Sequence, residues 1–146
     1  MQVRAILAAK GRDVVTIEPD ARVMEAANLM RRVDIGALVV ADAHGAMLGM
    51  LTEREITRGL ANCSYRLVDM RVAQIMSRTV VTCGPEDDVT TAMALMTHRR
   101  TRHIPVVDNG RLCGIVSLGD VVKSRLDDVE LEVRVLRDLH LAHWGS

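Results

Sequence analysis

The chain has 146 residues, of which 49% are hydrophobic and 26% charged, with 19 basic and 19 acidic side chains. This length suits one ordinary domain with its own hydrophobic core, and the composition excludes a disordered chain. The balanced charge and an aromatic content of 1% argue against proteins that bind nucleic acids or anionic membranes through basic surfaces or stacked aromatic rings.

No apolar run approaches the roughly 18 residues of a membrane span, and the apolar stretch before Lys10 is too short for a signal-peptide core. The three cysteines, Cys63, Cys83 and Cys113, are odd in number, and none lies in a CxxC pair. We therefore expect a soluble, cytoplasmic protein without a disulfide framework. The histidines and cysteines lack metal-ligand spacing, so no metal site and no required cofactor are expected.

An internal repeat organises the chain. Residues 14–42 align with residues 80–108 at an offset of 66, and ten of the 29 positions are identical. A one-residue gap near His44 keeps the halves in register beyond that point, and the lead-ins 3–7 and 72–76 also correspond. The pattern indicates a tandem duplication. The predicted divisions are repeat 1 with its lead-in at 1–66, repeat 2 at 67–125, and a C-terminal helix and tail at 126–146.

Each repeat predicts the same order of elements, β-α-β-β-α. A β-rich piece, 14–17 or 80–83, precedes a proline, which ends a strand and suits the entry to a helix. Apolar residues at i, i+3, i+4 and i+7, beginning at Val23 and Val89, then predict a helix. Two strands joined by a glycine-containing turn follow, and then a second helix. Since neither repeat is expected to bury its sheet alone, the predicted fold class is α/β (α+β), with two repeats packed pseudo-symmetrically.

A long helix is predicted from about Asp120 onward. Its apolar residues recur every 3.5 residues, a spacing typical of a helix–helix seam. The seam residues are Val122, Leu126, Val129, Val133, Leu136 and His140. One interpretation is a helix that lies on its own domain. The other is a contact in a homodimer, which is favoured because the stripe continues beyond the repeat that it follows.

A Gly-x-x-[Ser/Thr]-x-x-[Asp/Glu] motif occurs once in each repeat, where the second strand meets the second helix. The motif residues are Gly49, Thr52 and Glu55 in repeat 1 and Gly114, Ser117 and Asp120 in repeat 2. The glycine lets another group approach the backbone, the helix N-terminus offers N–H groups to a phosphate, and the carboxylate can accept hydrogen bonds from a ribose. The spacing therefore suits a nucleotide. It is also that of a helix-capping box, so a purely structural role stays open.

Further runs in the chain are a repeated Val-Val-Thr-x-x-Pro, RHIPVVD at 102–108 and GIVSLGDVV at 114–122. Together with IGALVV and LTERE, they make the chain resemble a tandem pair of cystathionine-β-synthase (CBS) domains, a Bateman module, over about residues 3–125. The resemblance is to stand-alone, bacterial-type two-repeat proteins. It implies a non-catalytic module that forms disc-shaped dimers and binds adenosine nucleotides such as AMP, ADP or ATP, or NAD(H) or S-adenosylmethionine.

The resemblance also implies roles for individual residues. Asp120 matches the ribose-binding acid of the family, and Ser117 and Thr52 match its partner hydroxyls. Glu55 departs from the usual aspartate by one methylene group, so the two sites are expected to be unequal. Arg54 is placed to reach a phosphate, where repeat 2 has a glycine. The other residues assigned to nucleotide binding are Lys10, Thr16, Ala37, Thr82, Arg102, His103 and Pro105.

The only dense basic run covers residues 98–103. It is typical either of a solvated helix C-terminus or of a phosphate-binding edge, at which Arg102 and His103 would lie beside the next strand. The predicted function is a sensor of adenosine nucleotides that signals to a separate protein through a change in the pose of its repeats or subunits. The alternative is an interaction scaffold, or a regulator of a redox partner, without a physiological nucleotide.

Overall fold

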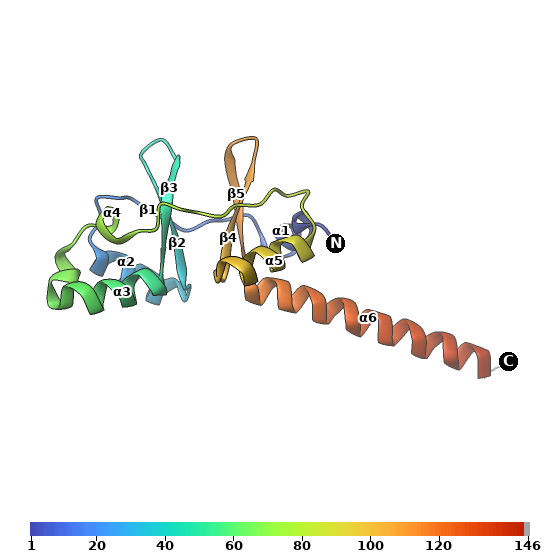
Figure 1. Cartoon of the computed structure of the whole chain (residues 1–146). Coiled ribbons are helices and arrows are strands. Elements are labelled where there is room, and N and C mark those ends of the chain that lie inside the picture. Colours follow the sequence, from blue (N-terminus) through green and yellow to red (C-terminus); the bar gives the residue numbers. More distant parts are fainter. Residues whose placement is uncertain (145–146) are drawn as a thin grey trace.

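The computed structural model describes residues 1–144. Within them, the order of elements matches the predicted duplication, with short additional helices at the lead-ins (Figure 1). The elements of the first half are α1 (Val3–Lys10), β1 (Thr16–Ile17), α2 (Val23–Val33), β2 (Ala37–Ala41), β3 (Met47–Thr52), α3 (Glu53–Cys63) and the 3-10 helix η1 (Ser64–Asp69). Those of the second half are α4 (Val72–Ile75), α5 (Val89–Arg99), β4 (His103–Asp108), β5 (Arg111–Ser117) and α6 (Leu118–Trp144).

Each half contains a small sheet. In the first half, β1 pairs parallel with β2, and β2 pairs antiparallel with β3; in the second half, β4 pairs antiparallel with β5. The expectation of a strand at 80–83 is wrong, because only Cys83 forms a single bridge, with Val106. The backbone that precedes this segment pairs with the other half of the chain, since Ser77 bridges Met50 on β3. The segment after that bridge therefore crosses between the halves instead of pairing along β4.

The two halves exchange their lead-in segments. Helix α1 contributes Val3, Ile6 and Leu7 to the core that is otherwise built from the second half. In return, Val72 and Met76 of the second lead-in lie in the core of the first half. Leu7 is 1% exposed, and burying a leucine in this way stabilises a fold by about 1.5–3 kcal/mol.

Backbone hydrogen bonds hold the exchanged segments in equivalent ways. The Arg4 N–H donates to the Pro85 carbonyl at 2.8 Å, and the Ala73 N–H donates to the Pro19 carbonyl at 3.0 Å. The two prolines that precede the main helices thus accept bonds from the lead-in of the opposite half. This exchange supports the expected pseudo-symmetric packing and explains why neither half closes its core alone.

Figure 1 shows the two hairpins, β2–β3 and β4–β5, next to one another, with α2 and α3 beside the first and α1 and α5 beside the second. Helix α6 begins at Leu118, continues without a break to Trp144, and runs away from the body. Residues 145–146 of the predicted C-terminal helix and tail lie outside the described residues. No helix within residues 1–144 has both the length and the apolar character needed to cross a bilayer.

Candidate functional site

The first motif forms the N-terminus of α3. Thr52 is the N-cap residue, and its hydroxyl oxygen accepts a hydrogen bond from the Arg54 N–H at 3.2 Å. Glu55 closes the box, because its Oε2 accepts the Thr52 N–H at 2.8 Å and also the Thr52 hydroxyl. The capping interpretation of this motif is therefore realised. The cap uses only Oε2 of Glu55; among the described residues, no hydrogen bond reaches Oε1.

The second motif caps α6 in the same way. The Asp120 N–H donates to Ser117 Oγ at 3.1 Å, and Asp120 Oδ2 accepts the Ser117 N–H at 2.8 Å. The carboxylate differs from Glu55 in its surroundings, because Lys10 Nζ lies 2.7 Å from the same Oδ2 and also donates to the Ile115 carbonyl at 2.9 Å. Burial raises the pKa of Asp120, but the hydrogen bonds from Lys10 and Ser117 outweigh it and leave this pKa below its usual value. Lys10, Ser117 and Asp120 are called the Asp120 cluster below.

The motif glycines do accommodate a close approach, and the approaching group is the chain itself. A Cβ on Gly49 would collide with the Ser77 backbone carbonyl, and one on Gly114 would lie 2.6 Å from Leu7 Cδ2. Both neighbours follow or belong to an exchanged lead-in. These glycines therefore serve the packing between the halves.

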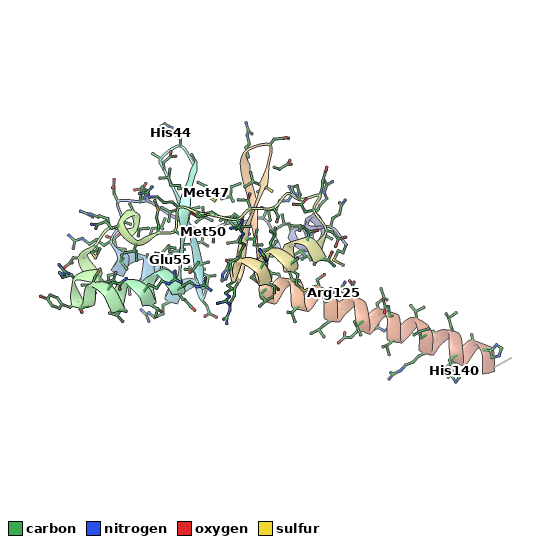
Figure 2. The ribbon with its side chains drawn as sticks, viewed as in Figure 1. His44, Met47, Met50, Glu55, Arg125 and His140 are labelled. Atoms are coloured by element: carbon green, nitrogen blue, oxygen red, sulfur yellow. The ribbon has the colours of Figure 1, made fainter. Side chains whose placement is uncertain are left out.

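A cavity of about 470 Å³ lies beside Thr52 and Glu55, and we call it the Thr52–Glu55 cleft. Its walls come from both halves: the end of β3 and the start of α3 on one side, and the 77–81 segment and the end of α5 on the other. Figure 2 shows Met50, one of the lining residues, between the two hairpins. The lining residues are Gly36, Met50, Thr52, Glu53, Arg54, Glu55, Arg58, Ser77, Thr79, Val80, Val81, Arg99, Thr101, Arg102 and His103.

Four arginines and two glutamates line this cleft. The arginines are Arg54, Arg58, Arg99 and Arg102. None of the four forms a salt bridge within residues 1–144. Arg54 instead donates to the carbonyl of Arg100, the left-handed residue that ends α5, and so joins the start of α3 to the end of α5. A cleft with an excess of guanidinium groups favours phosphate, whose oxygens match the paired N–H donors of arginine.

His103 begins β4 and lies between the two motif regions. Burial lowers its pKa, with Lys10 and Arg102 acting in the same direction and the carboxylates of Glu53 and Asp120 opposing them. The net direction is below its ordinary value. At neutral pH the imidazole is therefore uncharged and can donate or accept a hydrogen bond.

The repeat offset shows why the two motif regions differ in charge. Val33 and Gly36 stand in the first half where Arg99 and Arg102 stand in the second. In the second half, Gly119 stands at the position of Arg54. Of the four arginines, only Arg58 has a basic residue at the equivalent position, Lys123. The two motif regions therefore differ in charge, and the expectation of two unequal nucleotide sites stays a prediction.

Of the twelve residues assigned from the sequence, five line the cleft and three form the Asp120 cluster. The five are Thr52, Arg54, Glu55, Arg102 and His103. The other four lie in neither group: Ala37 and Pro105 are buried in strands, and Thr16 and Thr82 are exposed. Their roles in binding stay predictions.

Sequence reasoning did not assign Arg58, Arg99 or the 77–81 segment to the site. Arg58 stands four residues after Arg54 and hence on the same face of α3, which is a usable signal. Arg99 lies within the basic run already singled out. The 77–81 segment has no local signal, because only the crossing between the halves brings it to the cleft. Among the described residues, no group of three or more His, Cys, Asp or Glu side chains is arranged to hold a metal ion.

The comparisons with known proteins agree on one family. The family model for the CBS domain matches residues 4–62 and 72–127. The CBS domain-containing protein YhcV of Bacillus subtilis is 33% identical over 115 residues, which cover 79% of this chain and 81% of that protein.

Two crystal structures extend the comparison. A CBS-domain-containing protein of Agrobacterium tumefaciens is 44% identical, with a TM-score of 0.83 and coverage of 85% of this chain and 92% of that one. The CBS domain pair of protein MJ0100, solved in complex with 5-methylthioadenosine and S-adenosyl-L-methionine, is 28% identical, with a TM-score of 0.76 and coverage of 89% and 98%. The chain therefore belongs to the CBS-domain family, as a protein with two CBS repeats.

Proposed function

We propose that the chain is a non-catalytic regulatory module that binds a phosphate-bearing adenosine nucleotide in the Thr52–Glu55 cleft. The observation that carries the proposal is the meeting of a helix N-terminus, a half-buried carboxylate and four arginines around one cavity of about 470 Å³. Cavities of this size commonly hold small-molecule ligands. AMP, ADP, ATP and NAD(H) all combine a ribose with phosphate, and so they match both the acid and the arginines.

The described contacts support a definite orientation for such a ligand. The ribose hydroxyls would donate to Glu55, whose Oε1 is not used by the helix cap. The phosphates would lie against the guanidinium groups of Arg54, Arg58, Arg99 and Arg102. Met50, Val80 and Val81 supply the apolar part of the lining that is left for the adenine ring.

The same charges separate this ligand class from the one held by the MJ0100 domain pair. S-adenosylmethionine has no phosphate and carries a sulfonium cation, which four arginines would repel. We therefore place S-adenosylmethionine below AMP, ADP, ATP and NAD(H) in expected affinity for this chain.

The way in which a bound nucleotide would signal is inferred from the walls of the cleft, which both halves of the chain supply. Because both halves line the cleft, a bound nucleotide would stabilise those relative positions of the halves that fit it best. In a homodimer, the same difference in affinity would change the pose of the subunits. A separate protein would read that change.

The second candidate function is that of an interaction scaffold, which one specific observation favours. Both hydroxyl–carboxylate pairs are engaged as helix caps, so each motif has a structural role without any ligand. A scaffold would bind a partner protein, a redox partner included, through its surface.

Thermal denaturation with a panel of ligands tests the proposal. The panel contains AMP, ADP, ATP, NAD, NADH and S-adenosylmethionine, with GMP as the control for the base. A ligand at 100 times its dissociation constant adds about 2.7 kcal/mol to the free energy of unfolding, which is a shift of about 5–10 °C for a chain of this size. We expect such a shift with a phosphate-bearing adenosine ligand and none with GMP. A panel without any shift would contradict the proposal and favour the scaffold.

A further inference from the structure

Helix α6 leaves most of its length outside the body of the protein. Only Val121 of α6 is buried among the residues whose burial the structure describes. At about 1.5 Å per residue, the 27 residues from Leu118 to Trp144 span about 40 Å. Figure 1 shows the second half of the helix projecting beyond every other element, with Arg125 in Figure 2 near the point where it departs.

Helix α6 carries an apolar stripe along one face. Five of its members are 43–66% exposed: Val122, Leu126, Val129, Val133 and Leu136. They recur at alternating intervals of four and three residues, and His140 continues the spacing. This repeat of 3.5 residues keeps the stripe facing a second helix that winds around the first. The exposed seam therefore has the geometry of one half of a coiled coil.

We infer that a second copy of α6 covers this seam, with the two helices parallel and in register. The inference is independent of nucleotide binding. It rests on the charged residues that flank the seam, since flanking charges select the partner and its direction in coiled coils. Arg125 and Glu132 flank one side, and Glu130 and Arg137 flank the other.

In a parallel pair, each flanking residue on the first side meets the residue five positions later on the other helix. Arg125 then faces Glu130 of the partner subunit, and Glu132 faces Arg137 of the partner subunit. Two-fold symmetry repeats both contacts, so every one of these contacts joins opposite charges.

The antiparallel pair that overlaps the whole seam has the opposite electrostatics. Its midpoint lies at residue 131, so Glu130 would face its own copy on the other helix, and Glu132 would do the same. Lys123 would face Arg137 of the partner subunit. All of these contacts join like charges, which disfavours this pairing.

The seam residues alone do not choose the direction. Val133 followed by Leu136 is the order that favours two parallel strands, whereas Leu126 followed by Val129 reverses that order. The choice therefore follows from the charges. A parallel pair also places both bodies at the same end of the coiled coil, where one partner protein can contact both.

Disulfide trapping tests the direction directly. Leu126→Cys and Leu136→Cys chains are mixed and equilibrated in a glutathione redox buffer. A parallel, in-register pair brings each position next to its own copy, so it gives disulfides between identical positions. The full antiparallel pair brings position 126 next to position 136 and gives mixed disulfides. Peptide mass spectrometry distinguishes these products from links through the native Cys63, Cys83 and Cys113, and predominance of the mixed product overturns the inference.

Sedimentation velocity tests whether the seam associates at all. We expect the wild type to have twice the 16.1 kDa mass of the chain. Leu136→Glu should raise the dissociation constant of the dimer, while Leu131→Glu should leave it unchanged, because Leu131 is similarly exposed at 58% but lies off the seam. A monomeric or tetrameric wild type, or equal effects of the two variants, would overturn the inference. Leu131 and Leu136 are 58% and 66% exposed, so neither substitution buries a charge in the core and both variants should keep the fold.

A charge exchange supplies the third test. Arg125→Glu should raise the dissociation constant of the dimer by about tenfold, because two contacts become repulsive in the symmetric pair. Adding Glu130→Arg should restore the affinity, since position 125 again faces an opposite charge. In the antiparallel pair the added arginine would face its own copy, so failure of the restoration contradicts the parallel arrangement.

Discussion

Lys10 and Asp120, which are 110 residues apart in the chain, form an ion pair in which Nζ lies 2.7 Å from Oδ2. The lysine ends α1, the exchanged helix, and the acid lies in the first turn of α6. The contact therefore gives Asp120 a cation from the chain, whereas Glu55, its equivalent, has none within the described residues. It also joins the exchanged helix to the base of the projecting one.

Replacing Lys10 by methionine should lower the free energy of unfolding at pH 7 by about 1 kcal/mol, because the half-buried Asp120 loses a charged hydrogen-bond donor. The pKa of Asp120 in the folded wild type lies below its ordinary value of 3.8. The contribution of the pair is therefore present above that pH and is lost as the pH falls through the folded pKa.

Urea denaturation of the wild type and Lys10→Met, at pH 7 and near pH 3, measures this difference. The exposed Arg31→Met is the control for removal of a cation. A difference between wild type and Lys10→Met that stays constant down to the lowest pH would show that packing of the lysine stem, and not the ion pair, is responsible.

Glu55→Gln and Asp120→Asn form a matched pair for locating the nucleotide. Both changes weaken a helix cap, at a cost of about 0.5–2 kcal/mol, and Asp120→Asn also weakens the contact with Lys10. Only Glu55 lies in the cleft with the arginines. We expect Glu55→Gln to weaken binding of the nucleotide by about tenfold or more, as for the loss of a hydrogen bond to a charged group, and Asp120→Asn to change it less than about twofold.

Isothermal titration calorimetry with the ligand that gives the largest melting shift measures both affinities. Equal losses in the two variants would mean that the caps act only through stability, or that both motif regions bind. The reverse order would place the nucleotide at the Asp120 cluster.

The parts of the fold that could be predicted from the sequence are those that depend on local periodicity. The stripes beginning at Val23 and Val89 correctly predicted α2 and α5, because an amphipathic helix is specified by spacing alone. The exchange of lead-ins was not predictable in the same way. Val3 and Val72 begin similar patterns, and nothing in either pattern says which core each enters.

The candidate site shows the same limit. Thr52 and Glu55 were found from the sequence because the motif is short and its capping chemistry is local. Arg99 joined the site only because the end of α5 lies across the cleft from the start of α3, which depends on the arrangement of the two halves. Lys10 was assigned to nucleotide binding, but its contact with Asp120 was not predictable, because the exchange carries α1 to β5 and α6.

Gly49→Ala should destabilise the protein by about 1–3 kcal/mol, since the new Cβ would collide with the Ser77 carbonyl, a backbone group with little freedom to move. Gly119→Ala is the control, because a Cβ there meets only Ser117 Oγ at 3.6 Å and lies in the first turn of a helix. That change should be neutral or stabilise by up to about 1 kcal/mol. Chemical denaturation of both variants measures the contrast, and equal stabilities would contradict the close packing of β3 against the crossing segment.

His103 gives the protein a dependence on pH that has the same sign as that of Asp120 but begins at higher pH. Its pKa in the folded state is lowered from 6.5, first by burial and then by Lys10 and Arg102, against the opposing carboxylates of Glu53 and Asp120. The unfolded chain therefore binds the proton more readily. Its contribution to stability is fully present above pH 6.5 and is lost as the pH falls from there through the folded pKa.

Replacing His103 by asparagine should remove this part of the pH dependence, so that the variant loses less stability than the wild type between about pH 8 and about pH 5. His44→Asn, a change in the exposed turn between β2 and β3, is the control and should keep the wild-type dependence. Denaturation curves for the three proteins at several pH values measure the effect.

A phosphate bound beside His103 would favour the protonated form of the imidazole. A nucleotide should therefore raise the pKa of this imidazole, which titration of its ring protons by NMR detects directly. An imidazole that titrates at the same pH with and without nucleotide would mean that the phosphate does not lie near His103 in the cleft.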